Sequence, residues 1–433
     1  MLVFGHGITH LGVIRSLGSA GIPVYSVTDL PDFVSASRYY QTFREFRGQR
    51  AEPSRLREIL ERAPVERAVL IPCTDEWLKA IASLPPEMAH RFPTCLPSKE
   101  IIDTMVDKWC LAELLKREQV PHPRTVCLRT MREAEALPEE AYAGAFLKPR
   151  GSQEFARRYK VKAFSVKNRE EGLRALERAF SDEFSMVLQE YIPGPATAHD
   201  FVEGFVDRKG RMSYIARQRL RMYPPEFGNS TFAVSVPPEK VRQAAESLER
   251  LLARTGFRGA FGTEFKYDER DGQFKLLEIN ARPWWYVDFA EYIGVPVCQM
   301  AYQDALGYDV EPVREYRTGE YCVHISQDFL AYRALKKQGQ INLWNWVRSW
   351  IGARDAIFRW SDPGPALVNL MRARKRLAVH RRREIQGEIP SQEERTSAQP
   401  DNRPQVEPQH TMRGEWDARN DTRQESEPAP PQS

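Results

Sequence analysis

The stretch Gly256–Trp285, GFRGAFGTEFKYDERDGQFKLLEINARPWW, constrains the fold of this chain more than any other. Within it, two segments of strand-like composition, Phe261–Tyr267 and Phe274–Ile279, flank a cluster of turn-forming residues at Asp268–Gly272. Strand-like segments on both sides of such a cluster predict a β-hairpin. The aliphatic residues of the second segment also predict a strand that is buried on both faces: Leu276, Leu277 and Ile279.

The register of the hairpin decides which side chains meet. Alternation along the second strand places four residues on one face, namely Phe274, Leu276, Glu278 and Asn280. If Tyr267 pairs with Gln273, then Glu264 lies opposite Leu276 and diagonal to Glu278, at roughly 7–8 Å between backbone positions. A connecting loop of three residues keeps this register, whereas a loop of four would flip it.

Two carboxylates and an amide oxygen on one side of a strand pair indicate a metal site. Mg²⁺ takes oxygen ligands and usually binds through one or two carboxylates together with phosphate oxygens. An exposed hairpin with a polar outer face is the alternative, and it explains Glu264 alone. It explains Glu278 less well, because a carboxylate in a doubly buried strand is costly without a counter-charge. The sequence therefore predicts Glu264, Glu278 and Asn280 as ligands of Mg²⁺ or Mn²⁺.

Length, net charge, cysteine spacing and apolar runs limit the classes of protein to which this chain can belong. The 433 residues leave room for two or three domains, and the formal charge of +4 implies no strong polyanion partner, so no nucleic acid is expected. The six cysteines are scattered without a CxxC spacing, which fits reduced thiols in a cytoplasmic protein. No apolar run approaches 18 residues, and no signal-peptide pattern opens the chain.

The chain opens with a βαβ pattern. Met1–Gly18 reads as a short strand, a glycine turn and a helix, and Ile22–Val27 reads as the next strand. A dinucleotide-binding fold is the rival interpretation, but His10 stands where GxGxxG needs its last glycine. The first strand begins almost at Met1, so residues are expected to precede it. Further along, Thr74 and Asp75 either touch substrate at a strand end or simply cap a helix.

These features together resemble the ATP-grasp superfamily, whose members join a carboxylate to an amine or similar nucleophile through an acyl phosphate. The hairpin stretch is similar to the metal-binding hairpin of that superfamily. The order of a glycine turn, SRYY at Ser37–Tyr40, IPCTDEW at Ile71–Trp77 and then Asp107-Lys108 is similar to D-aspartate-ligase-like members. The match extends along most of Met1–Gly307.

The resemblance implies where a nucleotide would bind. Lys108 and Lys148 would reach its phosphates, and a lysine inside the apolar strand Ala145–Pro149 is costly unless it meets an anion. Ser152 belongs to the loop that covers the phosphates in the superfamily, although the loop here departs from the glycine-rich pattern. Adenine would lie against the hinge formed by Glu190, Tyr191 and Ile192. Asp200 would hold ribose hydroxyls, or would be a solvated strand end.

Arginines are expected near the reacting group. By alternation Arg217, Arg219 and Arg221 share one strand face, which must be open to water or meet anions. From the resemblance, Arg217 is the cation near the acyl phosphate, and Arg282 stabilises the acyl phosphate or the tetrahedral oxyanion.

The part of the chain beyond the match is less informative. Leu343, Trp346, Val347, Trp350 and Ile351 share one helical face that is expected to dock on the core. A peripheral membrane or protein contact through 343–383 is the alternative, because basic residues crowd Arg372–Arg383. A homodimer is also possible. The polar composition from about Gly387 onward predicts disorder.

The expected fold class is α/β plus α+β. An amino-terminal Rossmann-like domain at 1–105 precedes an ATP-grasp domain at 106–310, in which the nucleotide lies between two sheets. A helical extension at 311–385 and a disordered tail at 386–433 follow. The expected activity is an ATP- and Mg²⁺-dependent ligation of a small carboxylate to a small amine. The alternatives are an ATP-grasp carboxylase, and a nucleotide-binding scaffold without catalysis that is recruited to a membrane surface.

Overall fold

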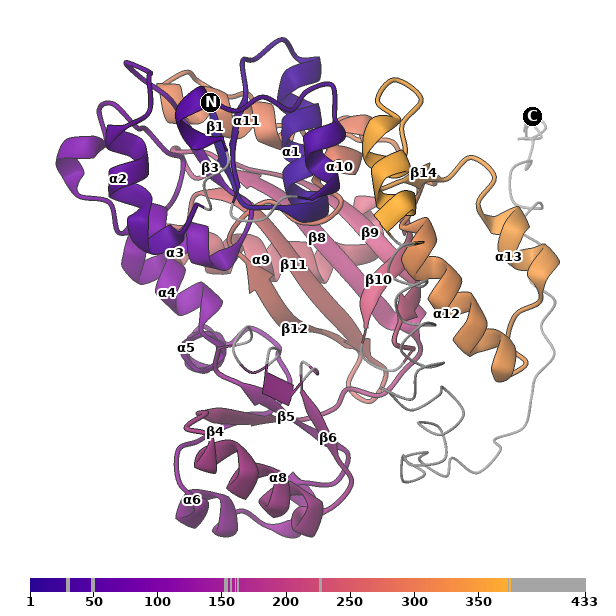
Figure 1. Ribbon diagram of the computed structural model, residues 1–433. Helices are drawn as coiled ribbons and strands as arrows, with labels where there is room; N and C mark the ends of the chain where they lie inside the picture. The colour runs from indigo at the N-terminus through magenta and orange to yellow at the C-terminus, as the bar shows by residue number, and fades with distance from the viewer. Residues whose placement is uncertain are drawn as a thin grey trace, which may run out of the picture. The chain divides into compact units, whose positions relative to one another are not determined.

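The computed structural model describes residues 1–28, 32–47, 51–151, 155, 158–159, 161, 163–225, 228–372 and 374. Ser152, most of the basic run at 372–383 and the tail at 386–433 lie outside the described residues. Residues Met1–Met371 form one compact unit, which contains three β-sheets (Figure 1).

The first sheet is parallel and has the strand order β2-β1-β3. Its strands are β1 (Leu2–Phe4), β2 (Tyr25–Val27) and β3 (Leu70–Pro72), and its helices are α1 (Gly7–Ser19), α2 (Leu56–Glu61), α3 (Asp75–Ala82) and α4 (Lys99–Val106). The predicted βαβ opening is thus confirmed. Gly5 adopts φ +127°, and a Cβ there would lie 3.1 Å from the Cβ of Cys73. The turn therefore needs glycine for packing.

The second sheet is antiparallel and has the order β4-β7-β5-β6. It consists of β4 (Thr125–Leu128), β5 (Ala145–Pro149), β6 (Phe164–Val166) and β7 (Met186–Gln189), with α5 (Lys108–Arg117) before it and α6 (Met131–Glu135) and α8 (Arg169–Ser181) on it. This sheet has a separate hydrophobic core, in which Leu147, Leu176 and Leu188 are buried.

The third sheet has seven strands in the order β12-β11-β8-β9-β10-β13-β14. The strands are β8 (His199–Val206), β9 (Met212–Tyr223), β10 (Asn229–Ser235), β11 (Gly259–Asp268), β12 (Gln273–Asn280), β13 (Tyr321–Val323) and β14 (Arg354–Asp355). The helices that accompany it are α9 (Arg242–Thr255), α10 (Val287–Ile293), α11 (Val297–Leu306), α12 (Ile325–Lys337) and α13 (Leu343–Ser349). Two hydrophobic cores extend from the first sheet into this one.

An amphipathic helical segment precedes the hairpin. Its apolar side chains are buried: Val241, Ala245, Leu248, Leu251 and Leu252. The first turn, Pro238–Val241, is a 3₁₀ helix, and α9 ends at Gly256, whose φ of +66° suits a left-handed cap.

The predicted hairpin is present as β11 and β12, but its predicted register is wrong. Asp268 pairs with Gln273 across a loop of four residues, which shifts the pairing by one position. The Asp268 carbonyl accepts a hydrogen bond from Gly272 N at 2.9 Å, and its carboxylate accepts one from Arg270 N at 3.1 Å. These bonds close the longer loop.

A β-bulge then compensates for the shifted register. Phe265 pairs with Leu276 and Glu264 pairs with Glu278, so Leu277 is the extra residue between them. The backbones of Glu264 and Glu278 consequently lie directly opposite each other and not diagonally. Leu276 and Glu278 were predicted to share one face of β12, but the bulge separates them. Leu276 lies in the hydrophobic core, whereas Glu278 lines a cavity.

Strand β12 is the edge of its sheet, so the prediction of burial on both faces is wrong. Ile279 is buried, but Glu278 is exposed. The chain partly covers this edge, since Leu276 N donates a hydrogen bond to the Pro121 carbonyl at 2.8 Å. Edge strands commonly carry bulges and charged side chains, and β12 has both.

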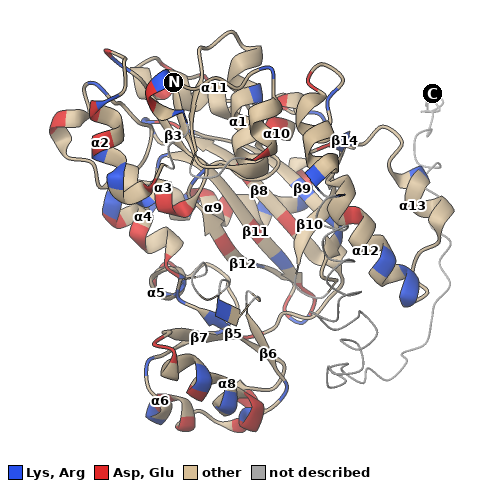
Figure 2. Cartoon of the chain, in the orientation of Figure 1, with Lys and Arg blue, Asp and Glu red and all other residues tan. Residues whose placement is uncertain are grey.

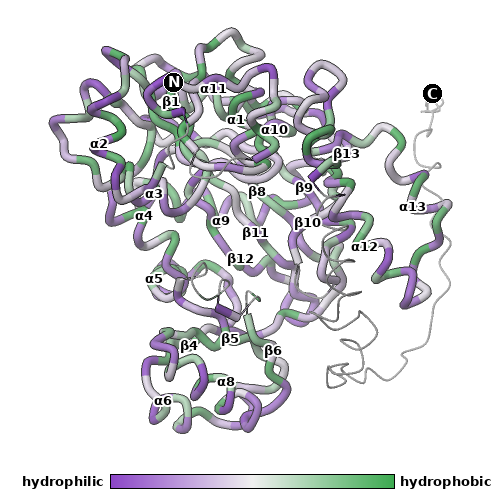
Figure 3. Tube along the Cα trace, in the orientation of Figure 1, coloured by the Kyte–Doolittle hydropathy of each residue, from purple (hydrophilic) through white to green (hydrophobic). Residues whose placement is uncertain are grey.

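Helix α13 docks on α12, but only through part of the predicted face. Trp346 is buried and stacks on Tyr332 with ring centroids 4.4 Å apart, whereas Leu343 and Ile351 are 54% and 77% exposed. The helix ends at Ser349, so Ile351 cannot follow the helical periodicity. Figure 3 shows hydrophobic and hydrophilic positions along both helices. Among the described residues, no helix is long and apolar enough to cross a membrane.

Candidate active site

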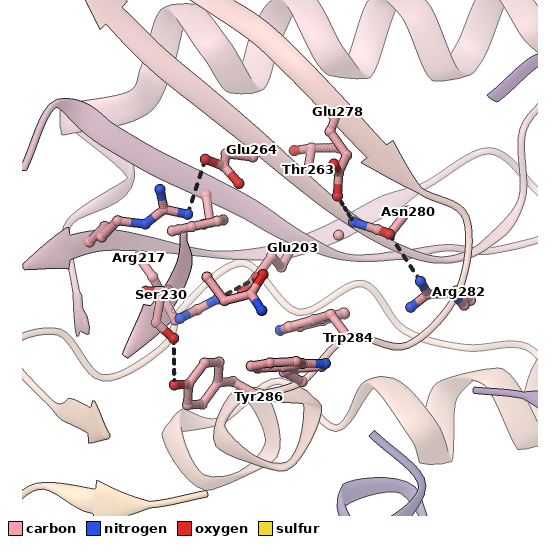
Figure 4. A pocket seen from close by; sticks show the side chains of 15 residues that line it. Glu203, Arg217, Ser230, Thr263, Glu264, Glu278, Asn280, Arg282, Trp284 and Tyr286 are labelled. Atoms are coloured by element: carbon pink, nitrogen blue, oxygen red, sulfur yellow. Dashed lines mark hydrogen bonds and ion pairs between the residues drawn. The ribbon is translucent and has the colours of Figure 1, made fainter. Parts of the chain in front are cut away.

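A cavity of about 210 Å³ lies over the strands of the seven-stranded sheet and is closed by the segment that follows β12. Figure 4 shows its polar lining, which consists largely of carboxylates and guanidinium groups. The charged residues that line it are Glu203, Arg217, Arg219, Glu264, Glu278 and Arg282. The aromatic wall is Trp284, Trp285 and Tyr286.

The carboxylates of Glu264 and Glu278 are the central pair of the cavity, because strand pairing places them opposite each other. Asn280, two residues along β12, donates its side-chain N–H to Glu278 Oε1 at 2.8 Å. The structure thus brings together the three residues predicted as metal ligands. Among the described residues, no group of three or more His, Cys, Asp or Glu side chains has the spacing of a metal site.

Glu264 is held in its ionised form. Its Oε1 atom lies 2.6 Å from His199 Nδ1 and 3.0 Å from a terminal nitrogen of Arg219. Burial alone would raise the pKa of Glu264, but the nearby Arg219 and the hydrogen bond from His199 lower it to about 2. A carboxylate with so low a pKa remains available to a cation at neutral pH.

Arg282 connects the hairpin to the first sheet. Its Nε donates to Asp75 Oδ1 at 2.6 Å, and its NH2 donates to Asn280 Oδ1 at 3.2 Å. Burial lowers the pKa of Arg282, but Asp75 raises it by more, and the net pKa lies above the ordinary value. Thr74 caps α3, since its Oγ1 accepts from Trp77 N at 3.5 Å, while Asp75 orients Arg282.

The three arginines predicted to share one face of β9 each pair with a carboxylate of the protein. Arg217 is buried and makes two hydrogen bonds to Glu203, at 2.6 and 2.5 Å. Arg219 pairs with Glu264, and Arg221 pairs with Asp328 of α12 at 2.8 Å. Each guanidinium is therefore matched by a carboxylate, which accounts for three like charges on one strand face.

Lys148 of β5 lies within electrostatic reach of the carboxylate pair. Its Nζ donates to Gln189 Oε1 at 2.5 Å. Burial lowers its pKa, the charges of Glu278 and Glu264 raise it, and Lys108 lowers it, with a net pKa below the ordinary value. Lys108 opens α5 directly after the capping residue Asp107. Figure 2 shows basic positions on β5 and acidic positions on the hairpin strands.

The predicted adenine hinge joins the second sheet to the third. Glu190 N donates to the Arg124 carbonyl at 2.9 Å, and its carboxylate pairs with Arg270 of the hairpin loop at 2.8 Å. Ile192 is buried. The Tyr191 ring lies 4.7 Å from Lys266 Nζ. None of these three hinge residues lines the hairpin cavity.

Asp200 does not join the other predicted site residues. It is buried, and its Oδ1 accepts from Lys240 Nζ at 2.7 Å. Alternation along β8 places Phe201 and Glu203 in the cavity and Asp200 on the opposite face.

Three residues that contact the predicted site were not singled out from the sequence: Glu203, His199 and Trp284. Glu203 lies in the apolar segment Phe201–Val206, and an acid in such a strand needs a partner. This rule could therefore have singled out Glu203 from the sequence. No comparable signal marks His199, which reaches Glu264 of the neighbouring strand β11, or Trp284, which lies in the segment after β12.

Comparison with solved structures defines the class of fold. A biotin carboxylase domain of 2-oxoglutarate carboxylase from Hydrogenobacter thermophilus, in complex with MgADP, ADP and bicarbonate, superposes with a TM-score of 0.58. It shares 19% identity, over 74% of this chain and 73% of the other. An L-amino acid ligase from Bacillus licheniformis gives a TM-score of 0.55 at 16% identity, over 74% and 77%. The chain has a mixed α/β, ATP-grasp-like fold.

Sequence comparison identifies a relative that is named as an enzyme. The D-aspartate ligase of Enterococcus faecium (strain Aus0004) is 25% identical over 250 residues, which is 55% of this chain and 59% of that protein. The match thus spans about three-fifths of the relative's length. No family model matches the chain. The sequence comparison confirms the resemblance to D-aspartate-ligase-like proteins, and the solved structures show a similar fold.

Proposed function

We propose that this protein is an ATP- and Mg²⁺-dependent ligase that joins a small carboxylate to a small amine and releases ADP and phosphate. The observation that carries the proposal is the pair Glu264 and Glu278, which lie opposite each other on paired strands and line a cavity with Arg219 and Arg282. The D-aspartate ligase and the L-amino acid ligase support this choice of reaction, since both relatives form bonds of this kind.

The residues of the cavity fit a hard divalent cation. Glu264, Glu278 and the amide oxygen of Asn280 form an oxygen-rich set on neighbouring strands, and such ligands suit Mg²⁺ or Mn²⁺. A bound Mg²⁺ supplies positive charge to the phosphate oxygens during transfer. Arg219 and His199 keep Glu264 ionised for this purpose.

We assign the nucleotide to the space between the second and third sheets. Lys148 and Lys108 would neutralise its phosphates, and Ser152 would contribute from the covering loop. Glu190, Tyr191 and Ile192 would line the base. The proposed domain limits remain 1–105, 106–310 and 311–385. Phosphoryl transfer depends mainly on positioning and electrostatics, which fixed cations provide.

Two arginines are proposed to act on the acyl group. Arg282 donates toward the cavity from the edge next to Asn280, where it would stabilise the acyl phosphate or the oxyanion formed on amine attack. Arg217 is also proposed to contribute positive charge, although its guanidinium is bound to Glu203.

The test is the substitution Glu278→Gln, assayed as ADP release across a panel of amino acids and other small carboxylates with amine acceptors. The substitution removes one charge at an exposed position, so the fold should be retained by circular dichroism. We expect at least a 100-fold loss of ADP release. Retained turnover in a folded variant would contradict the proposal.

A carboxylating enzyme is the second candidate, because the biotin carboxylase domain shares the fold. Bicarbonate dependence of ADP release separates the two reactions. A ligase releases ADP with carboxylate and amine alone, a carboxylase requires bicarbonate, and a nucleotide-binding scaffold releases none.

A further inference from the structure

A second cavity, of about 240 Å³, lies among α1, α10 and the segment 354–362. It shares no lining residue with the hairpin cavity. Its walls come from parts of the chain that are far apart in sequence, with Arg15 and Ser19 from the first helix and its end and Arg354 and Arg359 from near residue 360. In Figure 1, α1 and α10 lie side by side, with β14 close by.

Three guanidinium groups line this cavity, and each has a buried N–H without an acceptor. The atoms are Arg15 NH1, Arg354 Nε and Arg359 Nε, which have no hydrogen-bond partner among the described residues. Arg15 is only 5% exposed. Buried donors almost always have an acceptor, so three unsatisfied donors on residues that line one cavity indicate that an acceptor group belongs there.

The carboxylates that line the cavity do not meet this need. Asp362 accepts from Arg15 Nε at 2.9 Å and from Ser37 Oγ at 2.6 Å, and Asp288 accepts from Arg359 NH2 at 2.8 Å. Arg354 makes no ion pair with a described carboxylate, and its guanidinium lies 4.3 Å from the Tyr292 ring centroid.

The cavity also carries less negative charge than its three acidic residues, Asp288, Glu291 and Asp362, would give if all were ionised. Burial, and then the charge of Asp288, raise the pKa of Glu291 to about 7, so this carboxyl is partly protonated at neutral pH. Burial, and to a lesser extent the charge of Arg359, lower the pKa of Arg354 to about 10. With Glu291 protonated, three arginines face two carboxylates.

We propose that this cavity is a binding site for a small oxyanion, a carboxylate or a phosphate group, held by Arg15, Arg354 and Arg359. The planar guanidinium presents parallel N–H donors that match the oxygens of either group. Ser361 also lines the cavity and brings a further hydroxyl to it. This anion would be bound in addition to the substrates in the hairpin cavity.

The test is isothermal titration calorimetry on the full chain with orthophosphate and with succinate in separate experiments, at constant ionic strength set by chloride. Both titrations are run with and without MgADP, so that binding at the proposed nucleotide site is distinguished. We expect one of the two anions to bind with 1:1 stoichiometry and to identify the source as phosphate or carboxylate. Arg354→Gln should weaken that binding at least tenfold.

The control is Arg57→Gln, which removes an exposed arginine on α2 and should leave the affinity unchanged. If Arg354→Gln fails to fold, Ser19→Glu at the exposed rim brings a negative charge to the cavity and should also weaken binding tenfold. Absence of binding of both anions to the wild type, or equal affinity in the folded variants, would overturn the proposal. Neither result depends on turnover, so the ligase proposal is tested separately.

Discussion

At the scale of single residues, each buried charged side chain of this protein implies a partner of opposite charge. An ionised side chain in an apolar strand is costly unless it meets a group of opposite charge. Lys148 is such a residue, and the structure places it near the carboxylates of the hairpin. The same rule applies to Glu203, whose partner Arg217 lies on the neighbouring strand β9. Sequence alone shows that such a residue needs a partner but does not say which one.

Glu291 gives a prediction for the pH dependence of stability. Its pKa is about 7 in the folded protein, above the ordinary value of 4.5. Between these values the unfolded chain loses its proton first, so the free energy of unfolding should fall as pH rises from 4.5 to 7 and then level off. Glu291→Gln removes this dependence, and the variant should gain on the order of 2 kcal/mol relative to wild type between pH 4.5 and 8.

Urea unfolding of both proteins at pH 4.5, 6 and 8 measures this difference. Glu170→Gln is the matched control, because Glu170 lies on the surface of α8 and its side chain is 77% exposed. A constant difference between Glu291→Gln and wild type across the pH range would show that Glu291 titrates normally.

At the scale of elements, Asp328 fastens α12 and α13 to the seven-stranded sheet. This fully buried carboxylate accepts from Arg221 of β9 at 2.9 and 2.8 Å. It also accepts from the indole N–H groups of Trp346 and Trp350, both at 2.9 Å. A single side chain therefore holds three elements together.

Asp328→Ala should destabilise the protein by about 3–5 kcal/mol, because it leaves the buried Arg221 without a counter-charge. Tryptophan fluorescence should shift to the red as Trp346 and Trp350 lose their contacts. The control is Asp103→Ala on α4, which breaks an exposed pair with Lys99 and should cost less than about 1 kcal/mol. Equal effects of the two substitutions would contradict this role for Asp328.

At the scale of the whole molecule, the ion pair between Asp75 and Arg282 joins the first sheet to the hairpin, across 207 residues of sequence. Two cores also run from the first sheet into the third, whereas the second sheet has its own core. The first and third sheets are therefore packed as one body around the cavity.

A double-mutant cycle tests whether Asp75 acts through Arg282. If Arg282 stabilises the acyl group and Asp75 orients it, Asp75→Asn should lower kcat for ADP release about tenfold, and Asp75→Asn with Arg282→Gln should be no worse than Arg282→Gln alone. Additive losses would show that the two residues act independently. Thermal unfolding of the three variants checks that the fold is retained.

Local patterns in the sequence predicted several elements of this fold. Strand-like segments around turn residues predicted the hairpin, and alternation on β9 predicted three arginines on one face, because these patterns depend on local backbone geometry. The resemblance to ATP-grasp proteins rested on short motifs that are themselves local.

The way in which those residues meet depends on long-range pairing in the folded chain. The four-residue loop and the bulge at Leu277 place Glu264 directly opposite Glu278, and neither irregularity can be read from the period of the sequence. The partners of Arg217, Arg282 and Asp200 likewise come from distant segments. Side-chain pairing across strands depends on register and on folding of the whole chain, and a local pattern contains neither.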